Sequence, residues 1–505
     1  MTQSPTPDVL ILGAGAAGLA AAVALSGAGA SVCLLERKPF VGGRAYSYTH
    51  PALNEVIDSQ HVLLGCCTNL IDLCRLAGSA EHIRWYDRIT FLEPSRADAP
   101  ARRSEIAAGS LPAPAHNTLS FLRAPMLSLV DKSRIAIGLL EFLRGYPARD
   151  DEPFSAWLRR TRQSERAIRH FWEPIVVGTL NDTFERCSTR YAGQVFHESF
   201  LNSAAGGRFG IPSQPLSEFY GWVARLAQQQ GTVLRYRTSV ERMERLPNGL
   251  WQVVALDGCG RVARHTGPNL ILALPFEQTA RLLATLPEGS PQRQHILPLL
   301  QHFTHAPITT IHLWLDREVT DLEHAAFLDT RIQWLFNKSA IRGKKDVRRL
   351  EGVEGVADGE NRLGQRSAQG PAEGHYLELV ISASHAEIQQ RPDEILRSAM
   401  AELASFFPEV RRAKLLKSTV LKEARATFSV TPGLDRFRPK ADAPGENLFL
   451  AGDWTESGWP STMEGAVRSG RLAAEAVARA TGNDARFLVP GLPPTGLTRW
   501  LSVDR

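Results

Sequence analysis

The sequence lacks the patterns of several protein classes. It has no run of about 18 apolar residues, so no membrane-spanning helix is predicted. Its six cysteines form no CxxC pair and do not stand at zinc-ligand spacing with histidines, which favours reduced thiols in a cytoplasmic protein and no bound metal. The formal net charge of +5 comes without a nucleic-acid-binding pattern, so no nucleic-acid partner is expected.

The first 44 residues carry the feature that organises the chain. A short apolar run at 9–12 breaks into Gly13-Ala14-Gly15-Ala16-Ala17-Gly18, and an Ala/Leu-rich stretch follows. A second apolar run at 32–35 then ends at Glu36. This order of strand, glycine turn, helix, strand and acid is a βαβ unit with a dinucleotide fingerprint. At 505 residues the chain exceeds what one core usually serves, so a second domain is expected.

Each residue type of the fingerprint has a physical reason. Gly13 allows the tight turn, Gly15 lets a pyrophosphate approach the backbone, and Gly18 lets helix and strand pack closely. The helix N-terminus offers free N–H groups to the phosphates. Glu36 can accept both hydroxyls of a ribose, which favours FAD or NAD over NADP. The cofactor-binding residues predicted in this unit are Gly13, Gly15, Ala17, Gly18, Glu36, Arg37, Gly43 and Arg44.

A second glycine pair follows the acid, in Val41-Gly42-Gly43-Arg44. This arrangement resembles the start of the flavin-containing amine oxidase and phytoene desaturase superfamily. The resemblance implies FAD and an α/β fold, in which a Rossmann-like FAD-binding domain is interleaved with an α+β substrate domain. The expected segments are 1–95, 211–300 and 426–505 for the FAD-binding domain, 96–210 for a helical region at the substrate or membrane, and 301–425 for the substrate domain.

The second diagnostic stretch covers residues 447–470. It predicts a strand ending in Gly452-Asp453, a loop, and a helix that begins near Met463. Asp453 can accept hydrogen bonds near the ribityl chain or pyrophosphate. The positive end of the helix would favour the reduced, anionic flavin. In the superfamily the residue at Val240 holds the adenine through its backbone, so Val240, Gly452, Asp453 and Met463 complete the predicted cofactor contacts.

A closer resemblance comes from motifs spread over nearly the whole chain. They include Asp58-Ser59-Gln60-His61-Val62-Leu63-Leu64-Gly65, Phe121-Leu122-Arg123-Ala124-Pro125, Arg438-Pro439 and Glu464-Gly465-Ala466-Val467-Arg468-Ser469-Gly470. These motifs resemble hydroxysqualene dehydroxylases, the squalene-associated FAD-dependent enzymes of bacterial hopanoid synthesis. The resemblance implies reductive dehydroxylation of hydroxysqualene to squalene, with hydride passing from N5 of the reduced flavin to an allylic carbon.

Such a reaction needs an acid that protonates the leaving hydroxyl and an apolar path for the chain. His61 is the first candidate for the acid because its free pKa lies near neutrality, and Asp58 or Glu464 is the second. Predicted substrate contacts are Gln60, Trp334, Trp454 and Trp459, and the rings of the last two suit a cation. Two alternatives stay open: a carotenoid-type polyprene desaturase or isomerase, and a non-catalytic flavoprotein that binds polyprenes.

The family resemblance and the pattern of apolar and basic residues also predict the partners. Residues 118–144 are amphipathic and predict either core or a face that reaches a lipid substrate in the bilayer. The basic run 159–162 is either solvated surface or a contact for anionic headgroups, and residues 342–374 are expected to form a flexible loop. We therefore expect a long-chain isoprenoid substrate and a peripheral position on the inner face of the cytoplasmic membrane. An unidentified electron donor and a squalene or hydroxysqualene synthase are the expected protein partners.

Overall fold

A five-stranded parallel sheet carries the predicted βαβ unit. The computed structural model describes residues 6–96, 100–343 and 374–500. Every strand except the edge strand at 233–235 is fully buried. Apolar runs without polar alternation fit a sheet that is covered on both faces. The strand order is β10 (Val233–Arg235), β2 (Val32–Leu35), β1 (Val9–Leu12), β14 (Asn269–Leu272) and β20 (Leu448–Leu450).

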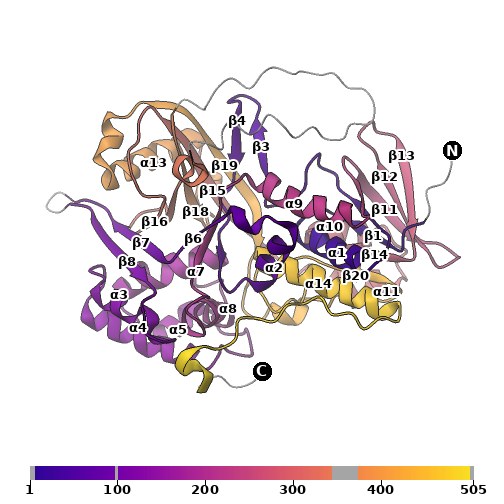
Figure 1. The fold of residues 1–505 in the computed structure, drawn as a ribbon, viewed down its shortest axis with the longest axis horizontal. Helices are drawn as coiled ribbons and strands as arrows, with labels where there is room; N and C mark the ends of the chain where they lie inside the picture. Colours follow the sequence, from indigo (N-terminus) through magenta and orange to yellow (C-terminus); the bar gives the residue numbers. More distant parts are fainter. Residues whose placement is uncertain (1–5, 97–99, 344–373, 501–505) are drawn as a thin grey trace.

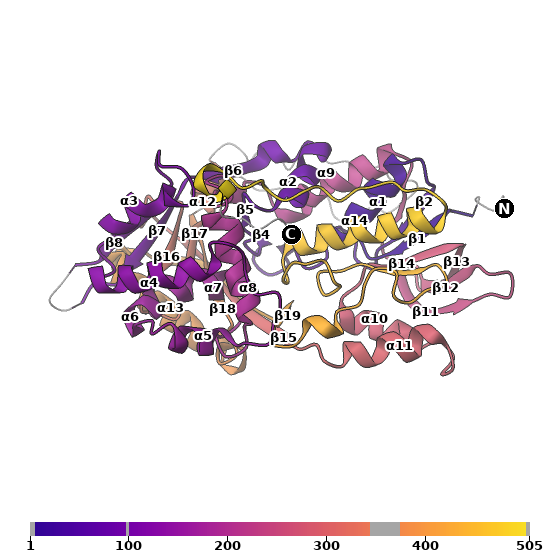
Figure 2. The same ribbon diagram turned by 90° about the horizontal axis from the view of Figure 1, so that it is seen from below.

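Different elements cover the two faces of this sheet (Figure 2). Val9 and Ile11 pack with helices α1 (Ala16–Gly27), α14 (Met463–Ala480) and α9 (Leu216–Gln229). Leu10 and Leu12 face the opposite side, where the residues of a second, antiparallel sheet pack. That sheet and its neighbours are β11 (Ser239–Arg245), β12 (Trp251–Leu256), β13 (Val262–Gly267), α10 (Phe276–Leu283) and α11 (Pro291–Leu300).

A seven-stranded sheet lies at the other end of the molecule (Figure 1). On one face, Leu377 and Leu379 pack against helix α13 (Pro392–Phe406). Because side chains alternate along a strand, Glu378 and Val380 lie on the opposite face. The strand order is β19 (Leu415–Phe428), β15 (His305–Leu315), β18 (His375–Ser382), β17 (Trp334–Asn337), β16 (His324–Phe327), β7 (Arg88–Glu93) and β8 (Arg102–Ala107).

The helical region packs around an aromatic core in which Trp157 and Trp172 contact Phe154 edge-on or stacked. Within the described ranges, none of the helices combines the length and apolar character that crossing a membrane requires. The helices are α3 (Thr118–Arg123), α4 (Leu129–Phe142), α5 (Phe154–Arg160), α6 (Glu165–Ala167), α7 (Glu173–Leu180) and α8 (Thr189–Phe196). The remaining elements near the centre are β3 (Ser47–His50), β4 (Glu55–Asp58), β5 (Leu63–Leu64), α2 (Thr68–Ala77), β6 (Ile83–Tyr86), β9 (Phe209–Pro212) and α12 (Lys338–Arg342).

The α/β fold class is confirmed, but the segments differ from the predicted boundaries. Strands β7 and β8 join the seven-stranded sheet, so the substrate domain begins before residue 96 and segment 96–210 is not wholly helical. The C-terminal tail leaves the five-stranded sheet and ends on the helical region, since the Leu497 N–H donates to the Ala113 carbonyl and the Thr495 N–H to the Asn202 carbonyl. Most of the loop predicted at 342–374 lies outside the described residues.

Candidate active site

The glycine turn between β1 and α1 is shaped by close backbone contacts. Gly13 has φ +99°, and a Cβ placed there would lie 2.6 Å from the Ala273 carbonyl oxygen. A Cβ on Gly18 would lie 1.9 Å from the Gly13 carbonyl oxygen. Both positions therefore require glycine for the fold itself, as the fingerprint predicts.

Gly15 differs from these two, because the chain itself leaves room beside it. The nearest atom to a Cβ at Gly15 would be the Gly43 Cα, 3.7 Å away, in the range of ordinary contact. Gly15 is the N-cap of α1, no side chain caps the helix, and Ala17 lies buried in its first turn. A Cβ on Gly43 would come within 2.9 Å of the Gly15 Cα. These two glycines keep the space before the helix N-terminus open, which fits a pyrophosphate.

Glu36 ends β2 and is held by the backbone around the turn. Its Oε2 accepts the Ala14 N–H at 2.8 Å and its Oε1 accepts the Lys38 N–H at 2.8 Å. Each carboxylate oxygen has a further lone pair for a ribose hydroxyl. Arg37 is exposed beside it. Val240 lies at the start of β11 at a β-bulge, and its carbonyl accepts from Arg281 Nη2 at 3.0 Å.

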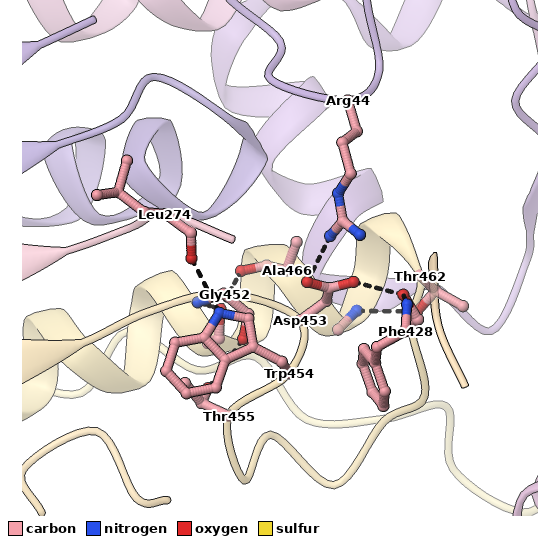
Figure 3. Close-up of polar contacts among 12 residues, drawn as sticks. Arg44, Leu274, Phe428, Gly452, Asp453, Trp454, Thr455, Thr462 and Ala466 are labelled. Carbon is pink, nitrogen blue, oxygen red and sulfur yellow. Dashed lines mark hydrogen bonds and ion pairs between the residues drawn. The ribbon is translucent and has the colours of Figure 1, made fainter. Parts of the chain in front are cut away.

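Arg44 and Asp453 join the two diagnostic motifs (Figure 3). Arg44 Nη2 lies 2.5 Å from Asp453 Oδ1, and Ser461 Oγ donates to Asp453 Oδ2 at 2.5 Å. Although burial alone would raise the pKa of Asp453, the adjacent Arg44 cation holds it below its usual value. The ion pair therefore stays charged at neutral pH. It ties residues 409 positions apart at the same end of the sheet.

The start of α14 lies directly beyond this ion pair. Thr462 is its N-cap and accepts the Gly465 N–H at 3.0 Å, so Met463 is the first helical residue. Gly452 has φ +145°, and its N–H donates to Ser469 Oγ at 2.8 Å. Gly452 and Asp453 thus contact α14 and the residues just before it, while the flavin contacts of Gly452, Asp453 and Met463 stay predictions.

Arg438 fixes the loop between β20 and α14. Its buried guanidinium donates from Nη2 to the carbonyl oxygens of Asp453 at 2.9 Å, Thr455 at 2.6 Å and Trp459 at 2.7 Å. Sequence reasoning quoted Arg438-Pro439 only as part of a motif and assigned it no role. The structure shows that this side chain orders the loop that carries Asp453.

The three tryptophans predicted to contact substrate lie in different surroundings. Trp454 is only 1% exposed, and its indole N–H donates to the Leu274 carbonyl at 2.9 Å (Figure 3), so the structure places it in the core. The ring of Trp459 already faces a cation, with Arg468 5.9 Å from its centroid. Trp334 is half-buried on the seven-stranded sheet and stacks on Phe209 with centroids 5.5 Å apart. Of the three, Trp334 lies on the face of that sheet that also carries Val380 and Glu378.

Among the three predicted acids, Glu464 has the surroundings that differ most clearly from those of a catalytic group. Its Oε1 accepts the Asn69 N–H at 3.1 Å, and its Oε2 accepts the Leu70 N–H at 2.7 Å. Glu464 thereby supplies the N-terminal cap of α2 from a helix far away in the sequence. Both oxygens are occupied inside the core, so the structure gives Glu464 a structural role in place of the predicted catalytic one.

Asp58, the second predicted acid, is buried among donors. Its Oδ2 accepts from Lys338 Nζ at 3.0 Å and from Arg342 Nη2 at 3.2 Å, while Oδ1 accepts the Leu216 N–H at 3.0 Å. Burial would raise the pKa of Asp58, but the two cations hold it below its usual value. Asp58 is therefore ionised at neutral pH, which contradicts a role as proton donor.

Gln60 and His61 follow Asp58 in the same polar segment. His61 Nδ1 lies 3.0 Å from the Ser59 carbonyl oxygen, and burial lowers the pKa of the ring. A neutral imidazole at pH 7 is a poor acid, which disfavours the predicted role of His61. Gln60 lies at the centre of a network, since its Oε1 accepts from Lys338 at 2.8 Å and its backbone N–H donates to Glu378 Oε1 at 2.7 Å.

Lys338 and Glu378 were missed by the sequence analysis. Glu378 stands alone among apolar residues in Tyr376-Leu377-Glu378-Leu379-Val380, and this lone acid within a strand pattern was the available signal. Lys338 gave no signal, because its partners Asp58 and Gln60 lie 280 and 278 positions away.

Comparisons with known proteins agree with this arrangement. The model of the flavin-containing amine oxidoreductase family matches residues 16–478. The chain belongs to this family. Membership confirms the predicted superfamily and its FAD cofactor, and the residues around Gly15 and Asp453 fit that group. The enzyme is therefore a flavin-containing oxidoreductase.

Named relatives are similar over most of their length. A probable zeta-carotene desaturase of Synechococcus elongatus is 26% identical over 94% of this chain and 98% of its own. A 15-cis-phytoene desaturase of the same organism is 26% identical over 93% and 95%. Among solved structures, an oxidoreductase from Methanosarcina mazei has TM-score 0.66 at 15% identity over 93% and 99%, and putrescine oxidase has 0.65 at 17% over 95% and 100%. The structural likeness shows the shared fold.

Proposed function

We propose that this enzyme is an FAD-dependent oxidoreductase of long, linear polyprenes, of the carotene-desaturase type. The observation that carries the proposal is full-length similarity to phytoene and zeta-carotene desaturases at about 26% identity. FAD would supply a hydride acceptor or donor at N5. In this chain the glycine turn, Glu36 and the Arg44–Asp453 pair would hold the cofactor, and the half-buried Trp334 on the seven-stranded sheet would contact the hydrocarbon.

Reductive dehydroxylation of hydroxysqualene is the second candidate. It is favoured by the motifs at 58–65, 121–125 and 464–470, which the sequence analysis compared with hydroxysqualene dehydroxylases. The two reactions run the flavin in opposite directions. Desaturation removes a hydride and a proton from adjacent carbons and leaves the flavin reduced. Dehydroxylation consumes reduced flavin and one proton and releases water from the allylic alcohol.

One pair of anaerobic assays separates the candidates. Oxidised holoenzyme is mixed with phytoene, and photoreduced holoenzyme is mixed with hydroxysqualene, each with flavin absorbance and lipid mass spectrometry as readouts. Bleaching of the oxidised flavin with a product two hydrogens lighter supports desaturation. Reoxidation with squalene formation supports dehydroxylation and replaces the first candidate. If neither substrate changes the flavin spectrum or the lipid, both assignments fail. The remaining hypothesis is then a flavoprotein that does not catalyse a reaction on polyprenes.

A membrane surface fits the outer helices of the helical region. Figures 1 and 2 place α3 and α4 at the end of the molecule away from the five-stranded sheet. Large apolar side chains there are 50% to 75% exposed, and exposed arginines flank them. The apolar residues are Leu119, Leu122, Leu129, Val130, Ile137 and Leu140, and the arginines are Arg123, Arg134 and Arg144. Apolar surface rimmed by cations suits an anionic bilayer, so we assign this face to peripheral membrane contact.

Vesicle flotation tests that assignment. Wild-type enzyme should float with vesicles that contain anionic lipid, and the Leu129→Glu, Ile137→Glu double variant should remain in the dense fraction. A matched double variant at exposed residues far from this face, Leu256→Glu with Val262→Glu, should float like the wild type. Equal flotation of all three proteins would contradict the assignment. The electron donor and a synthase partner stay predictions.

A further inference from the structure

A cluster of buried charges lies between the polar segment 58–61 and the seven-stranded sheet. Lys338 begins α12, and its side chain is only 2% exposed. Its Nζ lies 3.0 Å from Asp58 Oδ2, 2.8 Å from Gln60 Oε1 and 3.5 Å from Glu378 Oε2. Arg342, at the end of the same helix, adds a second cation to Asp58. The cluster thus joins β4, α12 and β18.

Glu378 is the member whose bonding is incomplete. Its side chain is fully buried, and Oε1 accepts the Gln60 N–H at 2.7 Å. Oε2 has no hydrogen-bond partner among the described residues and has only the ion-pair distance of 3.5 Å to Lys338. A buried carboxylate oxygen without a donor is costly, and a proton on that oxygen relieves the cost.

The neighbours of Glu378 are accounted for by other contacts. His312, directly opposite on β15, hydrogen-bonds Tyr376 Oη at 2.8 Å through Nδ1 and Thr310 Oγ1 at 3.1 Å through Nε2. Phe336 stands opposite on β17 and is apolar. The charged and titratable groups around Glu378 are Asp58, His61, Lys338, Arg342, His312 and Tyr376.

The charge balance of the cluster is set by this one residue. Lys338 and Arg342 carry two positive charges, and Asp58 carries one negative charge. Burial raises the pKa of Glu378 to about 7, and the Lys338 cation limits the rise. Burial lowers the pKa of His312 to about 3, so that ring stays neutral. Near neutral pH the cluster therefore passes between zero and one net positive charge as Glu378 gains a proton.

We propose that Glu378 is a proton-exchanging positioning residue of the active site, which holds the Gln60 backbone through one oxygen while the other gains or loses a proton. This inference rests on the proposed function for its link to chemistry. An ionised Glu378 accepts a charge-assisted hydrogen bond from Gln60 and attracts Lys338, whereas the protonated group binds both more weakly. The proton therefore controls how firmly segment 58–61, which includes His61, is held.

The segment that Glu378 controls also reaches the cofactor side of the site. Lys338 and Arg44 are both near enough to His61 to lower the pKa of its ring. His61 therefore has neighbours both in the buried cluster and among the predicted cofactor contacts. No electron transfer is part of this step, because Glu378 takes one proton from solvent water and returns it.

Infrared titration of the oxidised holoenzyme tests the proton site without any substrate. Acidification of the wild type should produce the carbonyl band of a buried carboxylic acid with a midpoint near pH 7. Glu378→Gln should lack that band, while Glu387→Gln, which changes another buried glutamate of the same domain, should retain it. Lys338→Met should move the midpoint upward by at least about one pH unit, since the carboxylate loses its cation.

Two outcomes would overturn the proposal. One is a wild-type titration without such a band between pH 5 and 9, which needs no variant to fold. The other is an unchanged band in Glu378→Gln or an unchanged midpoint in Lys338→Met. The link to chemistry is read from the pH profile of flavin reduction or reoxidation by polyprene, which should lose its break near pH 7 in Glu378→Gln. A titrating band in an enzyme that acts on no polyprene would refute the proposed function and leave the proton site standing.

Discussion

Alanine at two neighbouring glycines should separate cofactor binding from folding. At Gly15 the backbone has φ −74° and ψ 178°, which alanine adopts without strain, and the new methyl group would be 3.7 Å from the nearest atom. The free energy of unfolding of the apoprotein should change by no more than about 0.5 kcal/mol. The methyl group would occupy the space that the pyrophosphate needs, so the Kd for FAD should rise at least about tenfold, or about 1.4 kcal/mol.

Gly18→Ala is the matched control for this reasoning. Its methyl group would lie 1.9 Å from the Gly13 carbonyl oxygen, so the backbone of the turn must move. We expect the apoprotein to lose about 3 kcal/mol of unfolding free energy, at the upper end for overpacking. Denaturant unfolding of each apoprotein and titration with FAD by flavin fluorescence give the two quantities. Wild-type FAD affinity in Gly15→Ala, or wild-type stability in Gly18→Ala, would refute the assigned roles.

Three further variants test the contacts that organise the site. Glu464→Ala should cost about 2 kcal/mol in denaturant unfolding, because two N–H groups of α2 lose their cap, and full stability would contradict the structural role. Asp58→Asn should cost about 3 kcal/mol at pH 7. Because the folded-state pKa of Asp58 is lowered, this difference should persist above its unfolded pKa of about 3.9, decline below it, and vanish once the pH has fallen through the lower folded-state pKa. Arg438→Leu should weaken FAD binding at least about tenfold by fluorescence titration, while unaltered affinity would show that the loop orders itself.

The parts of the fold that could be predicted are those specified by local patterns. Continuous apolar runs predict strands at 9–12 and 32–35, and the structure has β1 and β2 at these residues. The turn between them requires glycine at position 18, where a Cβ would overlap the carbonyl oxygen of Gly13. Residues 447–470 likewise carry their own strand, positive-φ glycine and capped helix. Such features depend on neighbours within a few positions, so one sequence contains the needed information.

The catalytic side of the site could not be predicted in the same way. The position of Asp58 in a motif predicts a catalytic proton donor. Its ionisation is set, however, by Lys338 and Arg342, which lie more than 270 positions away. The residue type of Trp454 predicts a ring that stabilises a cation. The ring is buried instead, because it packs against Phe303 and donates to the Leu274 carbonyl. Charge and burial at these positions arise from long-range contacts that no local pattern records.

The face of the seven-stranded sheet that carries Glu378 bears on the substrate class proposed above. On that face Trp334 lies opposite Val380, and Phe336 lies opposite Glu378. Directly paired residues share a face, so buried Glu378 has an aromatic neighbour on β17 and the polar residues His312 and Thr310 on β15. An amine substrate brings its own charge and would need a paired anion, but Asp58 already has two cations and Glu378 is the only other acid of the cluster. A hydrocarbon chain needs no paired anion, and its reaction exchanges a single proton alongside the hydride. Both acids of the cluster are buried away from a charged ligand, which is consistent with the polyprene substrate proposed above.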